Sequence, residues 1–311
     1  MTETSTQLVL LFAAVVGLLF LATVAGELLR LVKSEDSPVV DTFVTRVHSW
    51  WAMVAILALA LISGRVAIVV LFAFCSFAAL REFLTLTKKT RADHWAMVVS
   101  FYVILPVQYV LIWWGQEGFF TSFIPVYAFL LLPILSMLRG AGASFLHRIS
   151  ETQWALMICV FCASHVPALL VLEIDGFGDK NVLLIAFLVL VVQLGDLMEY
   201  FAGRRFGRVR VAPTISSKTW EGIGCGLLFA VAVGWSFAWI TPFGVAWAGV
   251  LAGVSFLMGV GGALVLAAIK HDRGVRNWGH LIPGQGGFVD QLDSVFFAAP
   301  AFFYIVRYFW V

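Results

Sequence analysis

The stretch that decides the fold is Val182–Glu199, which reads VLLIAFLVLVVQLGDLME. A helix needs about 20 mostly apolar residues to cross a hydrocarbon core about 30 Å thick. This stretch comes close to that length, and its two carboxylates, Asp196 and Glu199, lie at one end. It predicts a membrane-spanning helix with charged groups near one membrane face.

Similar apolar runs recur along the whole chain, and we expect an all-α, polytopic membrane protein with about 8–10 transmembrane helices. The run 50–63 is short and ends at a tight Gly64-Arg65 turn, so it is either a full span or half of a re-entrant hairpin. The candidate spans are 7–29, 50–63, 66–83, 95–114, 122–138, 154–172, 182–199, 222–240, 245–269 and 294–311.

Composition supports a membrane protein and argues against a nucleic-acid partner. Apolar residues make up 61% of the 311 residues and charged residues only 12%, whereas a soluble domain carries about 25% charged residues. The net charge of +2 is too small to indicate nucleic-acid binding.

The distribution of Lys and Arg predicts the orientation. If all ten segments cross and the N-terminus is outside, 17 of the 20 Lys and Arg fall in inner loops. Cytoplasmic loops carry such an excess, so we expect a cytoplasmic (inner) membrane protein whose polar loops face the cytoplasm. The inner set is Arg30, Lys33, Arg46, Arg81, Lys88, Lys89, Arg91, Arg139, Arg148, Arg204, Arg205, Arg208, Arg210, Lys218, Lys270, Arg273 and Arg276.

The inner loop that follows Glu199 has the residue types of a phosphate site. Four arginines are followed by Ser216, Ser217, Lys218 and Thr219, directly before an apolar run. Hydroxyls, a lysine and free N–H groups at a helix start favour phosphate binding. Two alternatives remain for this region: interfacial pairing of Asp196 and Glu199 with Arg204 or Arg205, and contact of the cations with anionic lipid.

The inner loop 270–293 carries glycines and a pair of aspartates. Gly284, Gly286 and Gly287 allow a tight turn, and Asp290 and Asp293 follow at i and i+3 as the last helix begins. That spacing puts both carboxylates on one helix face. Two such ligands, completed by waters and phosphates, suit Mg²⁺; the alternative is that they only complement the helix dipole.

These motifs resemble the phosphatidate cytidylyltransferase (CDP-diacylglycerol synthase) family over about residues 185–305, with a divergent bacterial-type pattern. The similar segments are Asp196 with Tyr200, 203–207 and 218–222. The C-terminal signature matches at Lys270, Gly279, His280, Gly284, Gly286, Gly287, Asp290 and Asp293. The pattern departs at His271, Asn277, Gln285, Gln291, Ala263 and Ala267. The Ser-Pro-x-Lys-Thr-Trp motif of the family is one residue short before Lys218 and lacks its proline.

The resemblance implies transfer from CTP to phosphatidate or another lipid phosphate, with Mg²⁺ as cofactor. The implied catalytic residues are Asp290, Asp293, Lys270 and Lys218, and the implied metal ligands are Asp290, Asp293 and Asp196. The implied substrate-binding residues are Ser216, Ser217, Thr219, Arg204, Arg205, Arg276, His280, Gly286 and Gly287.

The departures leave other functions open. One is a CTP-dependent enzyme acting on another lipid, similar to a polyprenol kinase. Another is a catalytically impaired lipid-binding or scaffold homologue. A transporter is disfavoured, because the charges lie in loops and not at broken helices in the midplane. We expect one membrane domain, with hydrophobic helices over 1–180 and the catalytic region over 181–311, in contact with membrane lipids. A homodimer is compatible with this predicted architecture.

Overall fold

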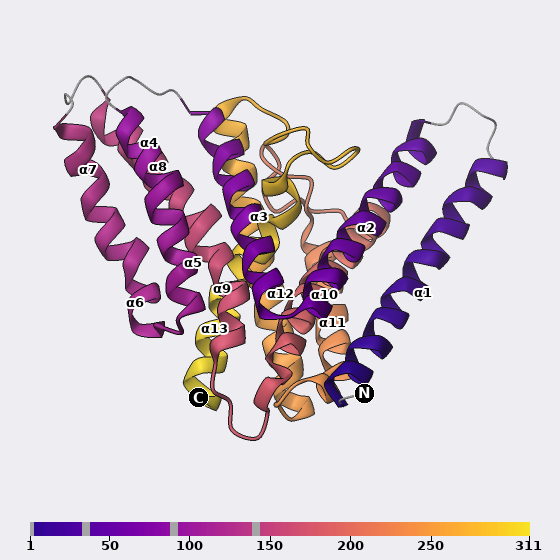
Figure 1. Cartoon of the computed structure of the whole chain (residues 1–311). Coiled ribbons are helices and arrows are strands. Elements are labelled where there is room, and N and C mark those ends of the chain that lie inside the picture. The colour runs from indigo at the N-terminus through magenta and orange to yellow at the C-terminus, as the bar shows by residue number, and fades with distance from the viewer. Residues whose placement is uncertain (1–2, 33–37, 88–92, 139–143) are drawn as a thin grey trace.

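The computed structural model describes residues 3–32, 38–87, 93–138 and 144–311, and it is all-helical (Figure 1). Over these residues the β-type pairing is limited to two isolated bridges, Arg210 with Thr219 and Ile282 with Gly286. The helices are α1 (Glu3–Val32), α2 (Pro38–Ser63), α3 (Arg65–Thr85), α4 (His94–Val99), η2 (Ser100–Ile104), α5 (Leu105–Trp113), α6 (Glu117–Ser122), η3 (Phe123–Ala128), α7 (Phe129–Met137), α8 (Phe145–Leu156), η4 (Met157–Cys162), α9 (Ala163–Ala168), η5 (Leu169–Val171), η6 (Gly178–Asn181), α10 (Val182–Phe206), α11 (Trp220–Ser236), η7 (Ala238–Ile240), α12 (Val245–Arg273) and α13 (Phe288–Trp310).

Nine helical stretches of the described chain are long and apolar enough to span a membrane, which confirms a multi-pass protein within the predicted range. Three of them are built from α-helical pieces joined by a π-helical turn. The remaining candidate span, 222–240, corresponds to α11, a shorter apolar helix of 17 residues. Lipid supplies no hydrogen-bond partners, so helices satisfy their backbone groups internally.

The short run 50–63 is the second half of a full helix. α2 begins at Pro38 and has 26 residues, so its first turns contain polar residues that an apolar window leaves out. Gly64 adopts φ 89°, which is the left-handed region that glycine tolerates. That turn reverses the chain into α3, so α2 and α3 form a hairpin of two long helices.

The C-terminal helices form the packed centre of the molecule. α10, α11, α12 and α13 pack against one another, and the largest fully buried side chains there include Phe187, Phe256, Phe296 and Phe302. Figure 1 shows α1 and α2 at one side of this bundle and α4 to α8 at the other.

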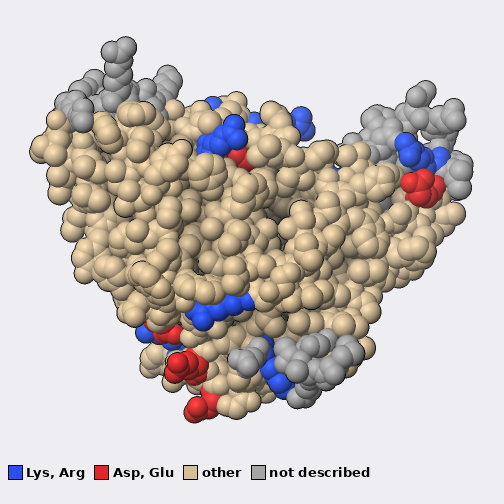
Figure 2. All heavy atoms as spheres, in the orientation of Figure 1, with Lys and Arg blue, Asp and Glu red and all other residues tan. Residues whose placement is uncertain are grey.

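Charged side chains gather toward two opposite edges of the molecule and leave a broad band without charge between them (Figure 2). The start of α1 and the end of α13 lie at the lower edge, whereas the 274–287 loop lies in the upper half (Figure 1). We call the end that carries the 207–219 and 274–287 loops the loop end. Lys33, Lys88, Lys89, Arg91 and Arg139 lie outside the described residues.

The charge distribution leads to a prediction about sidedness. Single cysteines in place of Arg208 and Asp175, in a chain without its native cysteines, should react with an impermeant maleimide from opposite sides of sealed vesicles. Arg208 is at the loop end, and Asp175 lies in the loop before α10 at the other edge. We expect Arg208 to label from the cytoplasmic side. Labelling of both positions from one side would contradict the topology.

Candidate active site

The end of α10 holds a buried carboxylate paired with a loop lysine. Lys218 Nζ donates to Glu199 Oε2 at 2.5 Å and lies 3.6 Å from Asp196 Oδ1. The Glu199 side chain is 6% exposed and that of Lys218 18%. The partner of Glu199 is therefore Lys218, and not Arg204 or Arg205. Lys218 brings a largely buried positive charge to the two carboxylates of α10.

The loop 207–219 is folded back so that Lys218 reaches α10. Val211 N–H donates to Lys218 O, and Trp220 N–H donates to Val209 O, both at 3.0 Å. Thr219 is the N-cap of α11 and its hydroxyl accepts from Gly222 N–H at 3.1 Å, which satisfies a free donor of the helix. A Cβ at Gly222 would lie 2.8 Å from Glu199 O, so only glycine lets α11 begin this close to α10.

A second lysine-carboxylate pair lies where α13 begins. Lys270 Nζ, near the end of α12, donates to Asp290 Oδ1 at 2.7 Å. The other oxygen, Oδ2, accepts from Trp278 N–H at 2.8 Å and from Gly287 N–H at 3.1 Å. Both oxygens of Asp290 are thus engaged within the protein. Asp290 holds Lys270 and closes the 274–287 loop onto the first turn of α13.

Asp293, about one turn further along α13, lies near both lysine-carboxylate pairs. It lies within electrostatic reach of Asp196, Lys218 and Lys270. Its Oδ1 accepts from the backbone N–H of Ser294 at 2.7 Å. Asp196 Oδ1 is buried and has no hydrogen-bond donor. Asp196 and Asp293 therefore retain the oxygens that are least satisfied by the protein.

The surroundings of Lys218 keep its ammonium charged. Burial disfavours the charged form, but the carboxylates of Asp196 and Glu199 outweigh that effect and raise the lysine pKa above its ordinary value. A raised pKa adds stability below the ordinary lysine pKa, and that stability is lost only as the pH rises through the raised value. Lys218 is therefore a fixed cation at neutral pH.

The remaining predicted substrate-binding residues divide into exposed and structural ones. Arg204, Arg205, Arg276, His280 and Ser217 are exposed at the loop end. Ser216 Oγ accepts from Lys218 N–H at 3.2 Å, and the hydroxyl of Thr219 is the cap described above. Gly286 has φ 101°, and Gly287 donates to Asp290. Ser216, Thr219, Gly286 and Gly287 thus shape the loops that carry the two lysines.

The three expected metal ligands do not converge. Within the described ranges, no group of three or more His, Cys, Asp or Glu side chains is placed to hold a metal ion. Asp290 binds Lys270 and backbone donors, while Asp196 and Asp293 both lie within electrostatic reach of Lys218. Mg²⁺ is commonly held by one or two carboxylates together with waters and substrate phosphates. The donor set of Asp196 and Asp293, with one orphaned buried oxygen, fits that pattern.

Two further groups at this end were not expected as site residues. Glu82 of α3 accepts from Phe288 N–H at 3.0 Å and from Val289 N–H at 3.1 Å. Arg46 and Ser49 of α2 donate to the carbonyl oxygens of Gly284 and Pro283. A carboxylate next to Arg81, near the end of a mostly apolar span, is the signal that the sequence offered for Glu82.

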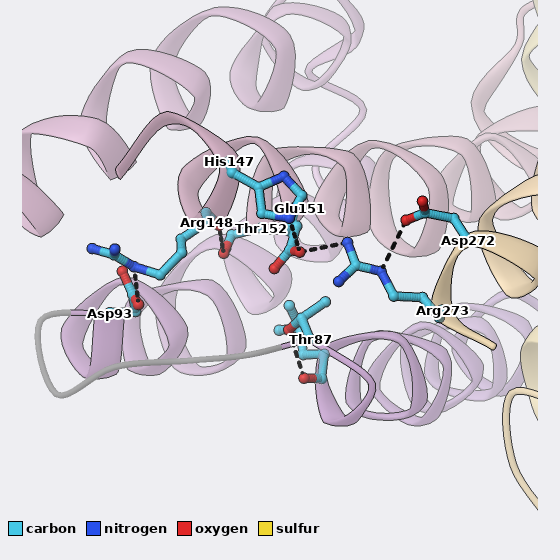
Figure 3. Close-up of polar contacts among 9 residues, drawn as sticks. Thr87, Asp93, His147, Arg148, Glu151, Thr152, Asp272 and Arg273 are labelled. Carbon is cyan, nitrogen blue, oxygen red and sulfur yellow. Dashed lines mark hydrogen bonds and ion pairs between the residues drawn. The ribbon is translucent and has the colours of Figure 1, made fainter. Parts of the chain in front are cut away.

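An ion pair joins the end of α12 to α8 in the N-terminal half of the chain. Arg273 Nη2 donates to Glu151 Oε1 of α8 at 2.5 Å, and His147 Nε2 lies 3.1 Å from the same oxygen. Figure 3 shows these side chains meeting between α12 and α8, with Arg148 and Asp93 nearby. Because Lys270 lies one turn before Arg273, this contact helps to fix where Lys270 is presented.

Comparison with known proteins places these features in a family. A sequence profile described as the cytidylyltransferase family matches residues 44–309, most of the chain. The chain is similar to the uncharacterized protein YnbB of Escherichia coli (strain K12), at 33% identity over 303 residues, 95% of this chain and 97% of that protein.

More partial similarity is found to two enzymes. A phosphatidate cytidylyltransferase of Mycobacterium bovis (strain ATCC BAA-935 / AF2122/97) is 32% identical over 165 residues, 51% of this chain and 50% of the enzyme. A phosphatidate cytidylyltransferase of Haemophilus influenzae (strain ATCC 51907 / DSM 11121 / KW20 / Rd) is 33% identical over 140 residues, 41% of this chain and 46% of the enzyme. The chain spans about half the length of these enzymes. With its profile match from 44 to 309, this multi-pass membrane protein belongs to the cytidylyltransferase family.

Proposed function

We propose that the protein transfers the cytidylyl group of CTP to a lipid phosphate, with phosphatidate as the acceptor, and releases pyrophosphate. Membership of a cytidylyltransferase family implies CTP and a lipid-type substrate. The observation that carries the proposal is the presence of two lysines at the loop end, Lys218 and Lys270, both within electrostatic reach of Asp293. Anionic substrates need such cations, and the apolar helices around them hold the lipid tails.

The reaction is a single displacement at phosphorus. A phosphate oxygen of phosphatidate attacks the α-phosphorus of CTP, the bond from that phosphorus to the bridging oxygen breaks, and its electron pair leaves with pyrophosphate. The products are CDP-diacylglycerol and pyrophosphate. Catalysis of this kind rests on positioning and on neutralising charge. Lys218 and Lys270 would bind phosphate oxygens, and the exposed Arg204, Arg205 and Arg276 would attract both anions to the loop end.

Asp196 and Asp293 would hold the Mg²⁺ that the family resemblance implies. The bound ion would neutralise part of the charge on the triphosphate. Lys218 limits the repulsion between the two carboxylates, and its hydrogen bond to Glu199 keeps its ammonium at that place. Asp290 would act through Lys270, which it orients, because its own oxygens already accept three hydrogen bonds.

A direct assay tests the proposal. Purified protein in liposomes that contain phosphatidate should release pyrophosphate and form CDP-diacylglycerol when CTP and Mg²⁺ are added. ATP or UTP in place of CTP, and liposomes without phosphatidate, serve as controls and should give much less product.

The products also separate the alternatives. A polyprenol kinase-like reaction would release CDP and a phosphorylated lipid, and no pyrophosphate. A protein that binds CTP or phosphatidate vesicles without turning over CTP on any lipid phosphate would be a lipid-binding homologue, and the proposed function would be wrong.

A further inference from the structure

Glu82 is a carboxylate that the proposed reaction does not use, and it is buried in an apolar helix. It is 6% exposed and lies near the end of α3, a 21-residue helix that is long and apolar enough to span a membrane. A charged group in such a helix is costly unless it has partners. Its hydrogen-bond donors are on α13, more than 200 residues away in the chain.

The Glu82 carboxylate binds the N-terminus of α13. Oε1 accepts from Phe288 N–H and Oε2 from Val289 N–H, the first two residues of that helix. These N–H groups have no partner inside the helix, and the helix dipole favours a negative charge there. The N–H of Gly287, the residue just before the helix, donates to Asp290. The start of α13 is therefore filled by two carboxylates of the protein itself, and it is not open to a substrate phosphate.

Two glycines make the room that Glu82 occupies. A Cβ at Gly279 would lie 2.7 Å from Glu82 Oε1, and a Cβ at Gly287 would overlap the carboxylate. Gly279 and Gly287 belong to the 274–287 loop and its junction with α13. The loop thus closes around the carboxylate and carries no side chain at the two points of contact.

We propose that Glu82 is a positioning residue: its carboxylate takes the place of a bound anion at the start of α13 and fixes the direction in which Asp293 faces Lys218. This inference rests on the proposed function, because it concerns the alignment of that same site. Asp293 lies four and five residues, or a little over one turn, beyond the two anchored N–H groups, so a tilt of the first turn moves it directly. The N-terminal half then contributes to catalysis through α3.

The alternative is that Glu82 only caps a helix and stabilises the fold. A cap and a positioning residue both slow local opening at residues 288–290, but only a positioning residue changes the chemical step while the fold stays intact. The experiment therefore needs a structural readout and a kinetic readout on the same variants.

Glu82→Gln and Glu82→Asp would be compared with the wild type and with Glu117→Gln. Glu117 is a matched control, since it is a partly buried glutamate paired with Arg307, which is in the last turn of α13 and not at its start. Gly287→Ala displaces the carboxylate without changing it, and Gly261→Ala, where a Cβ meets nothing within 4 Å, is its control. Hydrogen exchange of residues 288–290 and steady-state kinetics at varied CTP and Mg²⁺ are measured for each.

We expect exchange at 288–290 to become about tenfold faster in Glu82→Gln, as the loss of about one hydrogen bond implies. We expect kcat to fall by on the order of 30- to 100-fold, as small misalignments do, with a higher Mg²⁺ requirement and little change in KM for CTP. Glu82→Asp should recover part of the rate, and Gly287→Ala should behave like Glu82→Gln.

Unchanged hydrogen exchange at 288–290 in Glu82→Gln would show that the Glu82 carboxylate does not protect the N–H groups at the start of α13. Faster exchange with unchanged kcat and Mg²⁺ requirement would overturn the positioning role and leave only a cap. Absence of turnover in the wild type and in both controls would instead refute the proposed function, and the inference that rests on it would fall with it.

Discussion

Asp293→Asn is expected to lower CTP turnover by on the order of 10³-fold, equivalent to about 4 kcal/mol of transition-state stabilisation. Asp293 lies within electrostatic reach of Asp196, Lys218 and Lys270, so one substitution removes the carboxylate that interacts with both lysines. Asparagine keeps the size of the side chain and can still accept from Ser294 N–H. The variant should therefore remain folded, with an elution volume and thermal midpoint in detergent close to those of the wild type.

The comparison variants make this prediction specific. Asp272→Asn removes a 74% exposed carboxylate from the same end of the molecule and should leave turnover unchanged. Asp290→Asn should cost about 10- to 100-fold, the range typical of residues that orient a site, because Asp290 holds Lys270 and two backbone N–H groups. Equal loss in Asp290→Asn and Asp293→Asn would favour two metal ligands, as the sequence pattern predicts. Retained turnover in Asp293→Asn would show that Asp293 lies outside the reacting centre.

The fold could be predicted from the sequence because a membrane permits few solutions. Apolar runs of about 20 residues in lipid form helices, and the number of runs gave the number of helices to within the stated range. The one question left open, whether 50–63 is a full span, was local and has a clear cause. The first turns of α2, from Pro38 onward, include Asp41, Arg46 and His48, so an apolar window begins the helix near its middle and makes it look like a half-span.

The candidate site was only partly visible in the sequence. The two loops that carry Lys218 and Lys270 stand out by composition, and both lysines do lie against carboxylates. The pairing of Lys218 with Glu199 could not be predicted from their spacing in the sequence. Arg204 and Arg205 lie closer to Glu199 in sequence, but they are exposed, whereas the hairpin at 207–219 returns Lys218 to it. A chain reversal of this kind depends on the close approach of α10 and α11 at Gly222.

The roles of Asp290 and Glu82 depend on contacts that no local pattern reports. The i, i+3 spacing places Asp290 and Asp293 on one side of an uninterrupted helix. At a helix start, however, a residue at this position bends back to the N-cap N–H, and Asp290 does so at Gly287. Glu82 meets Phe288 across more than 200 residues of sequence, and a single sequence gives no measure of such a contact.

Loss of the Arg148 guanidinium is expected to be the most destabilising single change. Arg148 Nε donates to Asp93 Oδ2 at 2.8 Å, and the two side chains are 6% and 3% exposed. Figure 3 shows this contact between Arg148 of α8 and Asp93 at the start of α4. Asp93 also accepts from Ser136 Oγ of α7 at 3.2 Å. Arg148→Met leaves the Asp93 charge buried without its guanidinium, which costs about 3–5 kcal/mol in such pairs.

A double-mutant cycle separates this cost from simple loss of packing. In detergent, at one heating rate, Arg148→Met should lower the unfolding midpoint by on the order of 10 °C. Asp93→Asn removes the buried negative charge while its amide oxygen can still accept from Ser136, so Arg148→Met with Asp93→Asn should be more stable than Arg148→Met alone. The coupling measured in this way belongs to the pair. Additive effects of the two substitutions would mean that the pair contributes no more than its separate contacts. A positive coupling would mean that the N-terminal helices are held together at the end where α8, through Glu151, also holds the end of α12.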